Sequence, residues 1–250
     1  VHTLTDSITK DIMMVQEIIG TGEIAVSDHR SSQPSQEEFT RMAADTRLGG
    51  VLSGKAGVIN VHLGDGKRGM EPIRRVVEET EIPASQFLPT HINRNERLFC
   101  EAIEYAKQGG FVDFTGNETI DYWEKVSDEV RVCKGMKRML EAGVDPKHMT
   151  ISSDGQGSLP IFNEKGEFLE MGMGQSSCLL KEVRECVQRE GIPLETAISA
   201  ITANPAGILH LAGKGNVEEG YDADLCILTP GLELEEVIAR GKSVYKKREK

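Results

Sequence analysis

Short apolar runs alternate with amphipathic segments along most of the chain. Runs rich in β-branched residues predict buried strands at 18–26, 57–63, 87–92, 111–115 and 149–154. Apolar residues at helical spacing predict helices at 6–17, 37–48, 72–79, 96–107, 126–142, 175–190, 193–203 and 205–211. Strands and helices that alternate over short connections are typical of parallel βα units. The pattern therefore predicts an α/β fold with five parallel strands.

Capping residues and glycines set the expected limits of several elements. Ser35 is a suitable N-cap for the helix at 37–48, and Gly49 and Gly50 follow its last apolar residue. We therefore expect that helix to end before Gly49. The segment 117–123 lacks a clear period and predicts a loop or irregular structure.

Polar residues follow all but one of the predicted strands, which favours a (β/α)8 barrel of the TIM type. The active site of such a barrel lies at the C-terminal ends of its strands, and its eight units need about 250 residues. Five units with long insertions do not close one. The simplest interpretation is strands 4–8 of a barrel whose first three units, the missing N-terminal portion, lie upstream of Val1. A doubly wound open sheet is the alternative.

The pattern changes after Leu211. Short strands joined by turns are predicted at 214–217, 224–228 and 243–247, with a mostly apolar segment at 232–239. A tail of this size is too small for a core of its own. We therefore divide the chain into residues 1–212, the C-terminal portion of a barrel, and residues 213–250, the C-terminal strands of a small β domain.

Charge and cysteine content limit the classes of partner and the cellular compartment that we expect. The net charge is −11, and the only basic cluster lies at 246–250, so nucleic acid is not expected as a partner. No apolar run approaches the roughly 20 residues that span a bilayer, so no membrane partner is expected. Five scattered cysteines without CxxC spacing argue against a disulfide framework and favour a reducing cytoplasm. No G-x-S-x-G elbow is present, so a serine hydrolase is not supported.

Three of the strand ends carry residue types that bind metal ions. His62 and His91 each lie near the end of a strand, and Asp154 follows another just before Gly155. A lone histidine there is usually a hydrogen-bonded structural residue, and an Asp before Gly often caps a turn. Because strand ends of one barrel rim converge, the three together predict a metal site. Asp154 also suits a second role, taking a proton from metal-bound water and giving it to a leaving nitrogen.

Three more charged residues are candidates for the same site. Glu23 is the one charge in an apolar segment, where a cation would offset the cost of burying it. Its alternative is an exposed strand edge. Arg30 and Arg94 lie in loops just beyond the candidate ligands, where guanidinium groups suit the carboxylates of a substrate. The alternative for each is a surface salt bridge.

Several motifs resemble a known family. Residues 200–228, A-I-T-A-N-P-A-G-I-L-H-L-A-G-K-G-N-V-E-E-G-Y-D-A-D-L-C-I-L, resemble the C-terminal signature of the amidohydrolase superfamily. Four segments are similar to its isoaspartyl (β-aspartyl) dipeptidase family: S-D-H-R-S-S at 27–32, H-L-G-D at 62–65, L-P-T-H-I-N-R-N at 88–95 and S-S-D-G-Q-G-S at 152–158. The resemblance runs through nearly the whole chain.

The resemblance implies a barrel enzyme with two zinc ions per subunit that hydrolyses β-aspartyl dipeptides. His62 and His91 match the ligands of one zinc, and Asp154 matches the ligand of the other and the proton shuttle. Arg30, Arg94 and Ser158 match residues that hold the small dipeptide substrate. A hydroxide that bridges the two metals is the expected nucleophile. By analogy with the family, a homo-oligomer is expected.

The sequence departs from the family in two respects. Glu23 stands where the family has a bridging lysine carbamate, and we expect its carboxylate to bridge the metals instead. The family's His-x-His metal pair, its amine-binding glutamate and a tyrosine near the reacting carbonyl are expected upstream of Val1. Two alternatives stay open, a cyclic-amide hydrolase of the dihydroorotase or hydantoinase type and a non-catalytic amidohydrolase-like scaffold.

Overall fold

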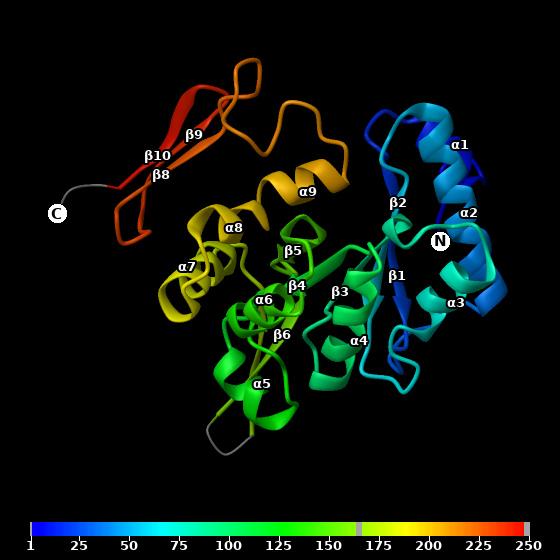
Figure 1. The fold of residues 1–250 in the computed structure, drawn as a ribbon, viewed down its shortest axis with the longest axis horizontal. Coiled ribbons are helices and arrows are strands. Elements are labelled where there is room, and N and C mark those ends of the chain that lie inside the picture. Colours follow the sequence, from blue (N-terminus) through cyan, green and yellow to red (C-terminus); the bar gives the residue numbers. More distant parts are fainter. Residues whose placement is uncertain (1, 164–166, 248–250) are drawn as a thin grey trace.

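Five parallel strands form the centre of the molecule. The computed structural model describes residues 2–163 and 167–247 (Figure 1). The strands are β1 (Gly20–Val26), β2 (Val58–Leu63), β3 (Phe87–Thr90), β4 (Val112–Thr115) and β5 (Met149–Ser152). Hydrogen bonds join β1 to β2, β2 to β3 and β4 to β5. The amide of Ile92 donates to the carbonyl of Asp113 at 3.4 Å, which places β3 beside β4.

The predicted α/β fold with five parallel strands in sequence order is therefore confirmed. Within the described residues these strands form an open arrangement, because β1 pairs only with β2 and β5 only with β4. The C-terminal ends of all five lie at the same edge, as parallel pairing requires.

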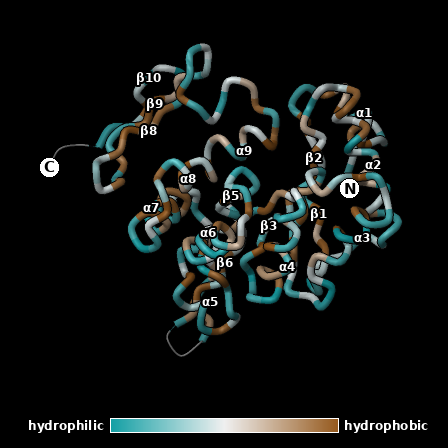
Figure 2. The backbone as a smooth tube through the Cα atoms, in the orientation of Figure 1, coloured by the Kyte–Doolittle hydropathy of each residue, from teal (hydrophilic) through white to brown (hydrophobic). Residues whose placement is uncertain are grey.

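Helices surround the strands (Figure 1). They are α1 (Ile8–Met14), α2 (Gln36–Ser53), α3 (Glu71–Glu79), α4 (Glu96–Lys107), α5 (Ile120–Val126), α6 (Val132–Glu141), α7 (Cys178–Glu190), α8 (Leu194–Ser199) and α9 (Ala203–Ile208). Phe39 of α2 packs on Phe87 of β3 with ring centroids 5.6 Å apart, and Phe99 of α4 lies 6.1 Å from Phe114 of β4. Figure 2 shows the hydrophobic residues gathered on the central strands and the inner helix faces.

The predicted end of α2 at Gly49 is wrong. The helix begins with the predicted cap, since the Ser35 side chain accepts the Glu38 amide, but it continues to Ser53. A Cβ on Gly50 would lie 2.5 Å from the Cα of Gly57. This glycine therefore permits close packing of the helix against the start of β2, and Gly54 in the left-handed conformation ends the helix.

The connection between β4 and α6 also differs from the prediction. The predicted loop at 117–123 contains most of α5, and α6 begins at Val132 and not at residue 126. Asp128 has a φ of 53°, which interrupts the helical path after α5. The amide of Val130 then donates to the carbonyl of Asn93, which ties this stretch to the end of β3.

A hairpin that the sequence pattern did not reveal follows β5. Its strands are β6 (Ser158–Phe162) and β7 (Phe168–Met173), which pair in antiparallel orientation. Neither strand has a fully buried face, so the alternation that identifies a half-buried strand is absent. The hairpin is instead held by aromatic packing, with Phe162 stacked on Tyr122 of α5 at 5.0 Å.

The C-terminal residues form a separate antiparallel sheet of β8 (Leu225–Leu228), β9 (Leu234–Ala239) and β10 (Lys242–Lys246). The predicted strands at 224–228 and 243–247 are thus confirmed to within a residue or so, and the apolar segment at 232–239 is β9. The predicted strand at 214–217 is wrong, because the backbone bends there, with Gly215 at a φ of 87°, and Lys214 pairs with Asp222 at 2.8 Å. No helix in the described part of the chain is long and apolar enough to cross a membrane.

Candidate active site

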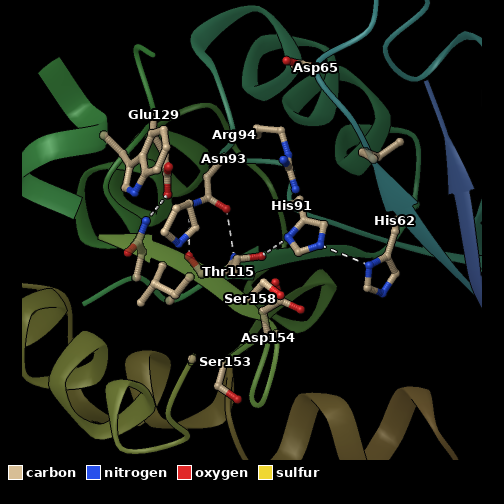
Figure 3. A pocket seen from close by; sticks show the side chains of 18 of the residues that line it. His62, Asp65, His91, Asn93, Arg94, Thr115, Glu129, Ser153, Asp154 and Ser158 are labelled. Carbon is tan, nitrogen blue, oxygen red and sulfur yellow. Dashed lines mark hydrogen bonds between the residues drawn. The ribbon is translucent and has the colours of Figure 1, made fainter. Parts of the chain in front are cut away.

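A cavity of about 940 Å³ opens at the C-terminal ends of the five parallel strands. Its lining includes every residue that the sequence singled out: Glu23, Arg30, His62, His91, Arg94, Asp154 and Ser158. Figure 3 shows the two histidines, Arg94, Asp154 and Ser158 around the same space. Parallel register therefore brings together side chains that are up to 135 positions apart along the chain, counted from residue 23 to residue 158.

His62 and His91 form the centre of this site. His62 of β2 is in register with Thr90 of β3, and His91 follows directly with a φ of 64°. That left-handed residue sends the His91 ring toward His62, so Nε2 of His91 lies 3.1 Å from Nδ1 of His62. On its other side, Nδ1 of His91 lies 2.7 Å from the hydroxyl of Thr115. The arrangement fixes the orientation of the His91 ring from both sides.

Burial sets the protonation of His91. Desolvation, followed by the positive charge of Arg94 and the neighbouring His62, lowers the pKa of His91 to about 3. Its imidazole is therefore neutral near pH 7, which is the form that binds metal ions. Two nitrogens bound to one tetrahedral zinc are about 3.3 Å apart, given zinc–nitrogen distances of roughly 2.0–2.1 Å. The observed spacing of 3.1 Å fits two ligands of one ion.

Glu23 is placed differently from expectation. It lies where the register of β1 is irregular, between Thr21 and Ile24. The carboxylate is 76% exposed, and its Oε1 lies 3.7 Å from Nε2 of His62. The expectation of a buried carboxylate is therefore wrong, because the Glu23 side chain is exposed, and its role as a metal ligand stays a prediction. Glu23 nonetheless lies beside the histidine pair.

Asp154 lines the cavity from the loop after β5. It has a φ of 46°, and the carbonyl of Asp154 accepts the amide of Gly157 at 2.9 Å. A Cβ on Gly174 would lie 2.7 Å from the same carbonyl oxygen, so a glycine is needed where the hairpin returns. The Asp154 side chain is exposed to the cavity. Ser158, the first residue of β6, follows on the same loop.

The expectation that His62, His91 and Asp154 surround a common cluster of cations stays a prediction, and all three line the same cavity. Across residues 2–163 and 167–247, no group of three or more His, Cys, Asp and Glu side chains is close enough to hold a metal ion. The site residues thus fit a metal through the histidine pair alone. The left-handed loop conformation holds Asp154 at the wall of the cavity, apart from that pair.

The two candidate arginines, Arg30 and Arg94, differ in their hydrogen-bond partners. The Arg30 side chain donates two hydrogen bonds to the Asp28 carboxylate, from Nη2 to Oδ2 at 2.7 Å and from Nε to Oδ1 at 2.9 Å. This pairing holds the pKa of Asp28 well below its usual range. Arg94 is largely buried, and its Nε has no hydrogen-bond partner in the described part of the chain. Burial and the repulsion of Arg30 lower the pKa of Arg94. A bound anion would therefore stabilise the positive charge of Arg94.

Asp113 is a residue that the sequence reasoning missed. It lies in β4, is 4% exposed, and accepts hydroxyl hydrogen bonds from Thr90 and Thr150 at 2.6 Å and from Ser152 at 2.5 Å. Burial raises the pKa of Asp113. These bonds join the ends of three strands just before His91 and the Asp154 loop. A carboxylate inside the apolar run at 111–115 was the available signal.

Two further residues on the β4 side of the cavity were also missed. Burial raises the pKa of Glu129, whose carboxylate accepts the Asn117 side-chain amide at 3.1 Å. Trp123 of α5 contributes an apolar surface to the lining. Both belong to the segment 117–131, where the pattern predicted a loop followed by an early start of α6.

Comparison with known proteins places this geometry in a family. The model of the amidohydrolase family matches residues 60–244. Crystal structures of a β-aspartyl dipeptidase from the thermophilic, keratin-degrading Fervidobacterium islandicum AW-1 are similar to the chain. The complex with β-Asp-Leu is 40% identical with a TM-score of 0.85, and a second structure is 37% identical with a TM-score of 0.83.

These similarities differ in extent. Both dipeptidase matches cover 98% of this chain, which spans 61% and 60% of the two longer chains. A curated imidazolonepropionase from Kosmotoga olearia is 51% identical over 43 residues, or 17% of this chain and 11% of that protein. That short match carries no information about substrate.

Proposed function

Because the chain belongs to the amidohydrolase family, we propose that it is the metal- and substrate-binding part of a dipeptidase that cleaves β-aspartyl dipeptides. The observation that carries the proposal is the histidine pair, 3.1 Å apart, in the same cavity as a partly buried arginine, Arg94, whose Nε has no hydrogen-bond partner among the described residues. The similarity to a β-aspartyl dipeptidase over 98% of the chain supports it.

The proposal includes the architecture and setting of the enzyme. Residues 1–212 would supply strands 4–8 of a (β/α)8 barrel, and residues 213–250 would supply strands of a small β domain. The substrate would be a small dipeptide, the assembly a homo-oligomer and the compartment the cytoplasm.

Members of this family are typically metal-dependent, and zinc is the metal that we propose, with two ions per subunit. His62 and His91 would hold one ion, and Glu23 and Asp154 are the carboxylates available for the second. The metal would supply Lewis-acid polarisation of the scissile carbonyl and a water of lowered pKa. Thr115 fixes the His91 ring through its hydroxyl, which orients the ligand nitrogen toward His62.

The remaining site residues bind the substrate and move a proton. Arg94 is the group best suited to a substrate carboxylate, because its side chain is partly desolvated and its Nε is unpaired among residues 2–163 and 167–247. Arg30 is already paired with Asp28, so it would contribute less to binding. Asp154, exposed to the cavity, would accept the proton of the attacking water and donate it to the leaving amine. Ser158 stands at the same loop and would donate a hydrogen bond to the dipeptide.

Turnover of three substrates by the zinc-loaded enzyme tests the proposal. We expect hydrolysis of β-Asp-Leu and none of α-Asp-Leu or dihydroorotate. Hydrolysis of dihydroorotate in place of β-Asp-Leu would identify a cyclic-amide hydrolase instead. Fewer than one bound metal ion per chain, with no turnover, would identify a non-catalytic scaffold.

Matched variants test the assigned roles. Arg94→Met should raise KM for β-Asp-Leu by at least about tenfold, and Arg30→Met by clearly less, because only Arg94 lacks an internal partner. Metal analysis of His62→Ala and His91→Ala should show lost zinc. Unchanged zinc content in Glu23→Ala would remove Glu23 from the metal site.

A further inference from the structure

The cavity has two chemically different walls. The wall built from the ends of β1, β2 and β3 carries His62, His91 and Arg94. The other wall comes from α5 and the β6–β7 hairpin, and its apolar members are Trp123, Leu159 and Pro160. In Figure 3, Glu129, which follows α5, lies across the cavity from His62. A substrate that reacts at the histidines would thus extend toward an apolar surface.

Trp123 is held in place by a cluster of aromatic rings. Its ring meets that of Phe162 of β6 edge-on at 5.6 Å and that of Tyr122 at 5.2 Å. Tyr122 in turn stacks on Phe162 with centroids 5.0 Å apart and planes 9° apart. The cluster ties α5 to the hairpin that carries Leu159 and Pro160. The wall is therefore a fixed surface, and a fixed aromatic surface loses little entropy when a ligand binds.

We propose that Trp123, Leu159 and Pro160 form a subsite for an apolar side chain on the C-terminal residue of the substrate. The inference rests on the proposed function. A β-aspartyl dipeptide carries two carboxylates and an ammonium group, so the side chain of its C-terminal residue is its only apolar part. Glu118 and Glu129 also line this side of the cavity. They would repel the C-terminal carboxylate there, and the ammonium group belongs to the aspartyl residue on the other side of the scissile amide, which leaves the C-terminal side chain as the occupant.

Substitutions at Trp123 and at its neighbour Tyr122 distinguish loss of the subsite surface from loss of packing between α5 and the hairpin. Trp123 lines the cavity, whereas Tyr122 belongs to the same cluster but is not part of the lining. Trp123→Ala removes the surface, and Trp123→Phe keeps much of it. Tyr122→Ala weakens the same contact between α5 and the hairpin without removing cavity surface.

The test measures kcat/KM for β-Asp-X substrates with X as Gly, Ala, Leu, Phe or Lys, using the zinc-loaded enzyme. We expect kcat/KM for Leu to exceed that for Gly by about tenfold or more. This ratio should fall to about 1 in Trp123→Ala and be largely retained in Trp123→Phe and Tyr122→Ala. Equal rates for all X, a preference for Lys over Leu, or an equal loss of the ratio in Tyr122→Ala would each overturn the subsite.

Fluorescence gives a readout that does not depend on turnover. Trp123 is the only tryptophan in the 250 residues, so its emission reports on this wall alone. β-Asp-Leu should shift that emission toward shorter wavelengths, and β-Asp-Gly should shift it less. If no β-Asp-X is hydrolysed, the proposed function fails, whereas the emission shift still decides the subsite. An identical emission with both dipeptides at saturation would refute it.

Discussion

Glu182 gives the sharpest prediction about stability. It lies in α7, is 2% exposed, and receives one hydrogen bond, from the amide of Asn117 to Oε1 at 3.3 Å. Its Oε2 is buried without a partner in the described part of the chain. Desolvation is the main reason why the pKa of Glu182 rises from 4.5 to about 7. The folded protein therefore holds this proton more tightly than the unfolded chain does.

The sign and size of the effect follow from linkage. Between the unfolded and folded pKa values the native state binds more protons, so the free energy of unfolding falls as the pH rises. The stabilising contribution is complete below about pH 4.5 and lost above about pH 7. A pKa difference of this size corresponds to about 3 kcal/mol in total, of which about 2.5 kcal/mol is lost between about pH 5 and pH 8.

Glu182→Gln replaces the carboxyl with a neutral group of the same shape and removes this penalty. Urea denaturation at several pH values, with metal held constant, gives the free energy of unfolding of the variant and the wild type. The two should be similar near pH 5, and the variant should be more stable by about 2 kcal/mol near pH 8. Glu195→Gln, on the exposed surface of α8, should follow the wild type at every pH. Parallel curves for the wild type and Glu182→Gln would refute the reasoning.

Two other perturbations test packing and buried hydrogen bonding. Thr150→Val removes one of the three hydroxyl donors of Asp113 and should lower the free energy of unfolding by about 1.5–3 kcal/mol, measured by the same denaturation; a loss below about 0.5 kcal/mol would contradict the importance of this cluster. Gly50→Ala should lower the free energy of unfolding by about 1–3 kcal/mol, because the new Cβ would collide with the backbone of Gly57. Gly207→Ala, where nothing lies within 4 Å of the new Cβ, should be neutral or stabilising in a thermal melt, and equal effects of the two alanines would reject the packing argument.

Local chemistry allowed much of the fold to be predicted. The five parallel strands were found because each belongs to a short, mostly apolar run, and α4 was found with its limits at Glu96 and Lys107. Such features depend on a few neighbouring residues, which one sequence contains in full. The hairpin of β6 and β7 was missed for the opposite reason. Its strands have no buried face to create an alternating pattern, and contacts with α5 hold them in place.

The candidate site was likewise predictable in its residue types and not in its geometry. The seven residues singled out in the sequence all line the cavity, because each lies in a parallel strand or in the segment that follows one. Asp113 and Glu129 were missed, because their importance comes from burial by segments distant in sequence.

The sequence by itself determined the order of strands and helices, the family and the side chains available for chemistry, since these follow from local patterns and motif spacing. Only the tertiary structure decided how those side chains meet. Register and backbone conformation bring His62 and His91 to 3.1 Å, leave Glu23 exposed, and pair Arg30 but not the Nε of Arg94. These outcomes depend on which strands lie side by side and on how much water each group loses, and neither is a property of neighbouring residues alone.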